Sequence, residues 1–207
     1  MKKTFLLFLI VLVFGNISFS QEATDQTEKS WGFGADANMY FLPGEFILLP
    51  VFRADKNKLH LEARYNYEDI ETFSGWVGYN FNGGKKLAFT ITPMVGGVIG
   101  LSNGIATGLE FSFIYKNFEW YAESEQLFDV ENKENNFYYM WSDLTYAPAD
   151  WLWLGLSTQR TRVYQTDLEI QKGFLIGTGY KSFELTGYVY NLGFDEPFML
   201  ITLSASF

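Results

Sequence analysis

Residues 198–207, FMLITLSASF, alternate between apolar and small polar side chains up to the final residue. Successive side chains of a β-strand point to opposite faces, so this stretch has two different faces. One face carries Met199, Ile201, Leu203, Ala205 and Phe207, and the other ends in Thr202, Ser204 and Ser206. Such a strand fits a sheet with lipid on one side and water on the other.

The same two-residue period recurs upstream, in segments separated by turn-forming residues. The clearest case is 59–68, where Leu59, Leu61 and Ala63, with Tyr65 and Tyr67, alternate with five polar residues: His60, Glu62, Arg64, Asn66 and Glu68. We count twelve segments between Trp31 and Phe207, with ten as the alternative because Pro50 and Pro93 weaken two of them. The pattern predicts an all-β fold, an antiparallel up-and-down transmembrane β-barrel of about twelve strands with short connections.

A soluble β-sandwich is the main alternative fold, since its strands also alternate. Two features disfavour it. The segments are longer than the usual five or six residues. Their apolar faces also end in aromatic residues beside the turns, as the interfacial girdle of a membrane barrel does. These residues are Phe81, Tyr115, Phe118, Tyr146, Trp151, Tyr180, Phe183 and Phe207.

The first twenty residues have the features of a secretory signal peptide. Lys2 and Lys3 precede an apolar run over 5–14, and small residues at Ser18 and Ser20 favour cleavage before Gln21. The run is too short to cross a bilayer as a helix, although a short membrane anchor is the alternative. We therefore expect a signal peptide over 1–20, a flexible polar tail over 21–30 and the barrel over 31–207.

Composition limits the classes of partner. The formal net charge is −9, which disfavours nucleic acid. The chain has no cysteine, so no disulfide framework supports the sheet. Aromatic residues make up 19% of the chain, a high share that membrane-interface girdles require.

The leader and the aromatic terminal strand together resemble those of bacterial outer-membrane β-barrel proteins, in a porin-like form without a specific family motif. The resemblance implies residence in the cell outer membrane, in contact with lipid and lipopolysaccharide. It also implies that Phe207, Ala205 and Leu203 form the insertion signal for the barrel-assembly machinery. An even strand count places both termini on the periplasmic side.

The polar faces are expected to converge on the interior, where acids outnumber bases. The predicted pore-lining residues are Asp36, Arg53, His60, Glu62, Arg64, Glu110, Glu119, Glu123, Glu125, Asp143, Glu169 and Glu184, with Asn38, Asn66, Gln159 and Gln171 as neutral members. An acidic lumen concentrates cations and repels anions. The leading hypothesis is a small-solute channel with a cation-preferring lumen.

The first alternative is a structural or accessory barrel that conducts nothing. Arg53 and Arg64 can pair with Glu62, Glu110 or Glu119 in a plug of salt bridges. Large interior side chains would help to fill such a plug: Tyr40, Tyr121, Tyr139, Trp141 and Trp153. Glycines at 173, 177 and 179 thin one inner wall, where they either let the barrel bend or leave room for bulky neighbours. We expect no connection long enough to fold into the pore, the longest exterior one being around 130–136.

The second alternative is an outer-membrane lipid-modifying enzyme. His60 is the single histidine, and Ser157 lacks the context of a nucleophile motif, so we expect no enzyme and no cofactor. Glu123 and Glu125 are weighed as Ca²⁺ ligands against the commoner interpretation of solvated like charges. Arg160 and Arg162 either bind lipopolysaccharide phosphates or pair with Asp167 or Glu169.

Overall fold

The computed structural model describes residues 30–161, 170–194 and 196–207. They form antiparallel strands with one 3-10 turn, η1 (Lys133–Asn135). The strands are β1 (Gly32–Leu42), β2 (Glu45–Lys56), β3 (Leu59–Tyr65), β4 (Phe73–Tyr79), β5 (Phe81–Gly83), β6 (Ala88–Ile99), β7 (Gly104–Tyr115), β8 (Phe118–Asp129), β9 (Phe137–Ala149), β10 (Leu152–Arg160), β11 (Gln171–Tyr180), β12 (Phe183–Tyr190) and β13 (Phe198–Ser206). No helix among these residues is long and apolar enough to cross a membrane.

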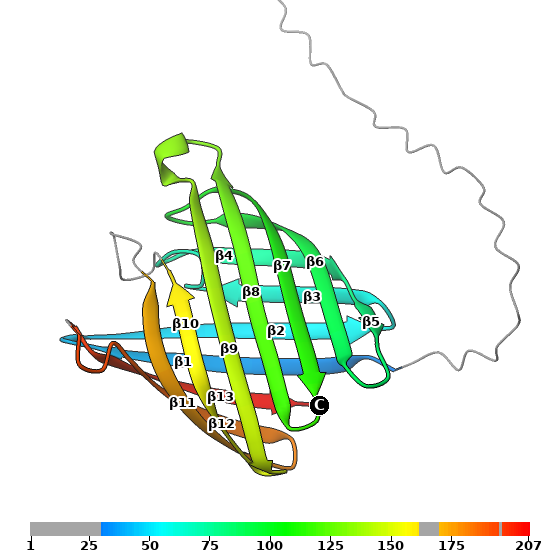
Figure 1. Ribbon diagram of the computed structural model, residues 1–207. Coiled ribbons are helices and arrows are strands. Elements are labelled where there is room, and N and C mark those ends of the chain that lie inside the picture. Colours follow the sequence, from blue (N-terminus) through cyan, green and yellow to red (C-terminus); the bar gives the residue numbers. More distant parts are fainter. Residues whose placement is uncertain (1–29, 162–169, 195) are drawn as a thin grey trace, which may run out of the picture.

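The strands close into a barrel (Figure 1). Sequence neighbours pair with each other, and β1 pairs with β13 in the register Gly34↔Ser206 to Phe41↔Met199. The short β5 continues β4, because both pair with successive parts of β6. The thirteen segments therefore occupy twelve positions around the barrel, which confirms the predicted count. Pro50 and Pro93 both lie within strands, so the alternative of ten is wrong.

The two ends of the barrel differ, and we call them the turn end and the loop end. The turn end has two-residue connections at 57–58, 116–117, 150–151 and 181–182, and a four-residue connection at 84–87. Asn57, Lys116 and Lys181 have positive φ, which tight hairpin turns require. Both ends of the described barrel chain lie here, where Phe33 and Phe207 exchange backbone hydrogen bonds of 3.1 and 2.8 Å.

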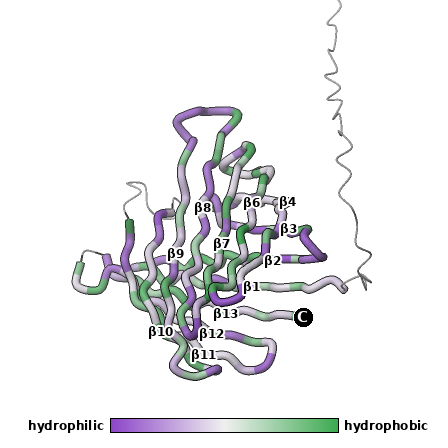
Figure 2. Tube along the Cα trace, turned by 45° about the vertical axis from the view of Figure 1, so that its right-hand side comes forward, coloured by the Kyte–Doolittle hydropathy of each residue, from purple (hydrophilic) through white to green (hydrophobic). Residues whose placement is uncertain are grey.

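The loop end carries the longer connections. The polar 130–136 segment with η1 extends beyond the rim between β8 and β9 (Figure 2). Strand β10 ends at Arg160 and β11 begins at Gln171, and most of the expected extensions of these two strands, to 164 and from 168, lie outside the described residues. Arg162, Asp167 and Glu169 lie outside the described residues.

The outer surface of the barrel is apolar. All eight aromatic residues predicted for the girdle are exposed there, from 41% for Tyr146 to 73% for Tyr180 and Phe207. Leu203 is also exposed and Ala205 is half-buried, on the same face of β13 as Phe207. An outward band of exposed apolar side chains with aromatic residues at its rim is the surface of a lipid-embedded barrel.

Candidate functional site

The lumen holds a cavity of about 630 Å³, which we call the vestibule. Its lining includes the turn at Lys116 and Asn117 and the strand end at Ser206, so it reaches the turn end. Its inner limit is formed by Tyr67, Trp141 and Tyr188 near mid-barrel. Carboxylates dominate its charged lining: Asp36, Glu62, Glu110, Glu119, Glu123, Asp143 and Glu184, against Arg53, Arg64 and Lys116.

Most of the predicted pore-lining residues border this space. Those that do are Asp36, Arg53, Glu62, Arg64, Glu110, Glu119, Glu123, Asp143 and Glu184. His60 and Glu125 face the interior but are buried in the wall, and Glu169 lies outside the described residues. Among the neutral members, Asn38 borders the vestibule, whereas Gln159 and Gln171 are buried.

Asn66 departs from the predicted alternation. It has a φ of 57°, and its side chain bonds the Leu48 carbonyl and the Glu71 amide instead of facing the lumen. Regular extension ends at Tyr65, so the next side chains no longer alternate. Tyr67, which the pattern places on the lipid face with Tyr65, turns inward and is 8% exposed. The expectation for both residues is wrong because a left-handed residue breaks the strand parity.

Arg64 is the centre of the charged wall. Its Nη2 lies 2.5 Å from Glu62 Oε2 and 3.5 Å from Glu110 Oε1, and its Nη1 lies 3.4 Å from Glu125 Oε2. The guanidinium carbon also lies 4.8 Å from the centre of the Trp76 ring. Four strands thus supply the partners of one cation, which we call the arginine cluster. Strand alternation on β3 places Glu62 and Arg64 on the same inner face.

Arg53 and His60 extend this network along the wall. Arg53 pairs with Asp36, and its Nε lies 3.2 Å from Glu62 Oε1. His60 Nδ1 lies 2.8 Å from Asp55 Oδ1, and its Nε2 lies 3.1 Å from Glu62 Oε1. The pairs predicted for the plug with Glu62 and Glu110 therefore exist. They follow the wall of the vestibule, whereas Glu119 instead accepts a hydrogen bond from Ser112.

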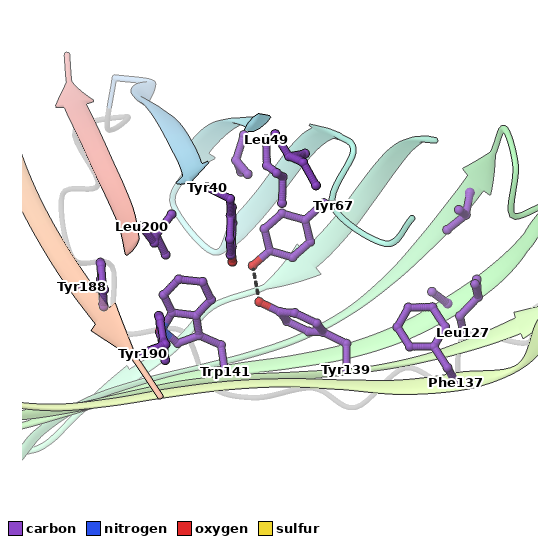
Figure 3. Packing of buried hydrophobic residues seen from close by; sticks show 14 of the residues in the cluster. Tyr40, Leu49, Tyr67, Leu127, Phe137, Tyr139, Trp141, Tyr188, Tyr190 and Leu200 are labelled. Carbon is purple, nitrogen blue, oxygen red and sulfur yellow. Dashed lines mark hydrogen bonds between the residues drawn. The ribbon is translucent and has the colours of Figure 1, made fainter. Parts of the chain in front are cut away.

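Aromatic side chains fill the barrel beyond the vestibule toward the loop end. Tyr67 and Tyr139 approach from opposite walls, and their hydroxyl oxygens lie 2.9 Å apart (Figure 3). The Tyr67 hydroxyl also donates to Glu123, and the Tyr40 hydroxyl donates to Gln159. We call this set the aromatic layer: Tyr40, Tyr67, Tyr139, Trp141, Tyr188, Tyr190 and Phe198, none of them more than 8% exposed.

A short loop between β3 and β4 contributes to this closure. Residues 66–72, the inward loop, fold back into the barrel with positive φ at Asn66 and Glu71. Glu68 is 1% exposed and accepts hydrogen bonds from Ser74 Oγ at 2.5 Å and Trp76 Nε1 at 3.1 Å. The expectation that no connection is long enough to enter the pore is therefore wrong. Two left-handed residues let a short loop reverse into the lumen.

Asp143 organises the inner limit of the vestibule. Its Oδ1 accepts hydrogen bonds from Ser157 Oγ at 2.5 Å and Trp141 Nε1 at 2.8 Å. Its Oδ2 accepts from the Tyr188 hydroxyl at 3.1 Å. One carboxylate therefore fixes two rings of the aromatic layer. Strand alternation predicts Asp143 and Trp141 on the same inner face, but it carries no signal that Ser157 and Tyr188 are partners of Asp143.

Two sets of residues bear on metal binding. Ligand atoms of His60, Glu62 and Glu110 lie within 4.8 Å of one another, but Arg64 contacts both carboxylates and already supplies positive charge. Glu123 accepts from the Tyr67 and Tyr121 hydroxyls, and Glu125 pairs with Arg64. These carboxylates thus have protein partners in place of a cation, and the arrangement favours ion pairing over Ca²⁺ coordination.

Comparisons with known proteins identify the architecture. No protein-family model matches the sequence, and the curated proteins give no match. The structure is similar to the KdgM porin, with a TM-score of 0.55, 12% identity, and coverage of 85% of this chain and 99% of that one. A KdgM porin in complex with disordered oligogalacturonate gives a TM-score of 0.58 and 12% identity, covering 84% and 99% of the two chains. The Acinetobacter baumannii outer membrane protein Omp33 gives 0.47 at 14% identity, covering 86% and 97%.

Proposed function

This chain has the fold of an outer-membrane porin, and from that fold we propose that it is a channel for small solutes with an acidic, cation-preferring lumen. The observation that carries the proposal is the vestibule, a space large enough for a small molecule inside a closed barrel with an apolar exterior. The aromatic layer closes the loop end in the resting state. Conduction then requires the inward loop and its Tyr67 to move.

The same proposal includes the orientation of the barrel in the outer membrane. Residues 1–20 direct export and are removed, and the aromatic terminal strand, with Phe207, Ala205 and Leu203, directs insertion by the barrel-assembly machinery. The turn end faces the periplasm, because outer-membrane barrels have short periplasmic turns and longer external loops. The vestibule is then open to the periplasm, and solute from outside passes the aromatic layer first. Lipid and lipopolysaccharide surround the exposed apolar band.

The charge of the vestibule lining supports a preference for cationic solutes. Seven carboxylate residues and three basic residues line the vestibule, and two of the basic ones are already paired with carboxylates. Carboxylates in a narrow lumen raise the local concentration of cations and lower that of anions. The KdgM porin has been captured with oligogalacturonate, a polyanion. The excess of acid here disfavours a solute of that charge.

We expect the purified, folded protein to give discrete current steps in planar bilayers. The double substitution Glu119→Gln and Glu123→Gln is expected to lower the cation-to-anion permeability ratio by roughly threefold at moderate salt. The reason is that two vestibule carboxylates lose their charge while the side-chain volume stays the same. The ratio is measured from the reversal potential in a KCl gradient.

The matched control for this measurement is Glu131→Gln with Glu134→Gln, which removes two charges from the exposed loop between β8 and β9. It is expected to leave the permeability ratio close to that of the unmodified protein. An unchanged ratio in the Glu119 and Glu123 variant would contradict the proposal that the vestibule carboxylates cause the cation preference.

The inward loop gives the channel a pH dependence. Burial raises the pKa of the Glu68 carboxyl, against the opposing effects of Arg64 and the hydrogen bonds from Ser74 and Trp76. The folded-in loop therefore holds a proton more tightly than a released loop, so rising pH disfavours the folded-in state. We expect the open probability to increase from about pH 4.5 upward, by as much as roughly tenfold for each unit of pKa difference between the states.

This dependence is measured as open probability in symmetric buffers of increasing pH. Glu68→Gln is expected to flatten the curve because it removes the titrating group. Glu71→Gln, at an exposed position of the same loop, is the control and is expected to keep the slope. A curve that falls with pH in the unmodified protein would show that another group controls the loop.

A non-conducting accessory barrel is the second candidate. The buried arginine cluster and the aromatic layer favour it, because together they pack the lumen from mid-barrel to the loop end. It predicts silent bilayers from verified folded protein, both for the unmodified chain and for variants with a reduced aromatic layer. The channel proposal predicts current steps from the unmodified chain and a higher open probability in the reduced variants.

A further inference from the structure

An indole ring lies flat on the wall of the vestibule. Trp153 of β10 faces Gly177 of β11 in the strand register. A β-carbon at Gly177 would lie 2.1 Å from the indole nitrogen, and one at Gly179 would lie 3.4 Å from the ring edge. The ring therefore packs directly against the wall at Gly177 and Gly179, where neither residue has a side chain. The sequence left two roles open for these glycines, bending of the barrel or room for a bulky neighbour, and Gly177 has the second.

The opposite face of this ring is open to the vestibule. Trp153 is half-buried and belongs to the cavity lining. Glu184 of β12 stands at its edge, since it pairs in register with Gly179 and its Cγ lies 3.7 Å from the β-carbon position of that glycine. Glu184 is exposed and forms no hydrogen bond or ion pair with any residue that the structure describes. A supported aromatic face and a free carboxylate therefore meet on the wet side of the barrel.

We propose that Trp153 and Glu184 form a binding subsite for small organic cations, meaning an ammonium group carrying methyl or methylene substituents. This inference rests on the proposed channel function, because the ligand is a solute that enters the vestibule. An aromatic face attracts a cation through its ring quadrupole, and tryptophan does so most strongly. The carboxylate at the ring edge supplies the complementary charge.

The pairing of these two groups selects against other solutes. An inorganic anion is repelled by Glu184 and by the other carboxylates of the vestibule. A hydrated alkali ion has no apolar surface with which to cover the indole, so it gains only the charge interaction. A substituted ammonium ion is weakly hydrated and presents apolar groups to the ring and positive charge to the carboxylate. Thr186, Thr202 and Ser204 add hydroxyl groups to the same lining.

The test measures binding without requiring conduction. Full-length folded protein in detergent micelles is titrated with tetramethylammonium chloride by calorimetry, with NaCl and glucose as comparison solutes. We expect a Kd on the order of millimolar for tetramethylammonium. Trp153→Leu is expected to weaken it about tenfold, Trp153→Phe less, and Glu184→Gln by a few-fold, since each removes a different part of the contact.

The control is Trp151→Leu, the same substitution two residues away on the lipid-facing side, which is expected to leave binding unchanged. Heat-modified gel mobility verifies that each variant is folded, and Trp153→Phe keeps the test valid if Trp153→Leu does not fold. Equal binding in the Trp153 and Glu184 variants overturns the subsite. Binding of glucose that depends on Trp153, without binding of tetramethylammonium, overturns the assignment to cations.

Failure of the subsite and failure of the channel are distinguishable. Tetramethylammonium binding that depends on Trp153, in a protein that is silent in bilayers, supports the subsite and contradicts conduction. If tetramethylammonium added on the turn-end side leaves the current steps unaltered in both the unmodified protein and Trp153→Leu, the subsite is contradicted. The channel proposal then still stands. Reduction of single-channel current by tetramethylammonium, lost in Trp153→Leu, supports both.

Discussion

Replacing Tyr67 and Tyr139 together by alanine is expected to convert a mostly closed barrel into a mostly open one. Their rings meet across the lumen with centroids 5.3 Å apart, and their hydroxyl oxygens are within hydrogen-bond distance of each other. Tyr67 also donates to Glu123 on the far wall and lies under the Arg64 guanidinium, whose carbon is 4.5 Å from the ring centre. These contacts hold the inward loop across the path.

The size of the effect depends on the hydrogen bonds that hold the closed state together. Removing the two hydrogen bonds of Tyr67 costs the closed state about 2–3 kcal/mol, which shifts the closed-to-open ratio by roughly 30- to 150-fold. The missing rings also leave space in the aromatic layer. We therefore expect a higher open probability and a larger single-channel conductance in planar bilayers. Tyr67→Phe, which keeps the ring and removes the hydroxyl, is expected to raise open probability with little change in conductance.

The matched control is Tyr65→Ala. Tyr65 lies two residues earlier, is 42% exposed and faces away from the lumen. We expect its loss to leave both current parameters unchanged. If the Tyr67 and Tyr139 double variant folds and gives no current, the aromatic layer is not the element that closes the path, and the non-conducting alternative is correct.

Strand parity, the alternation of successive side chains between the two faces of a strand, explains how much of this architecture the sequence predicts. In a closed barrel every strand has one face in lipid and one in the lumen, so alternation at 59–65 or 198–207 determines the side of each residue. The strand count, the outward aromatic residues and the inward carboxylates follow from that rule. Parity alone also predicts that Tyr139, Trp141 and Trp153 lie inside, and all three do.

Parity fails where the backbone leaves the extended region. Asn66 adopts a left-handed conformation, and from that residue the side chains of 67–70 no longer follow the strand pattern. The Asn at this position was the available signal, since Asn tolerates positive φ better than most residues. Parity also carries no information about partners across the lumen. The convergence of Glu62, Glu110 and Glu125 on Arg64 depends on barrel closure and register, which a single sequence does not specify.

Arg64→Met is expected to be the most destabilising single substitution in the lumen. Arg64 is 4% exposed, and its guanidinium lies within 3.5 Å of carboxylate oxygens on three side chains. Methionine fills much of the same volume but leaves Glu110 and Glu125 without their cation. Removing one partner from a buried ionic group costs about 3–5 kcal/mol, because the remaining charges stay buried and uncompensated. The free energy of unfolding in lipid vesicles, from urea titration, measures this loss.

Comparing Arg64→Met with Arg53→Met separates two effects on stability: the loss of an arginine charge, which both share, and the burial of that charge, in which they differ. The Arg53 side chain is 35% exposed at the vestibule, so water can replace part of its role, and we expect a loss below about 1 kcal/mol. Adding Glu110→Gln and Glu125→Gln to Arg64→Met is expected to restore much of the stability, since it removes the uncompensated charges themselves. Equal losses for the two arginine variants, or no recovery in the triple variant, would mean that Arg64 stabilises the barrel by packing against Tyr67 and Trp76 rather than by neutralising its carboxylates.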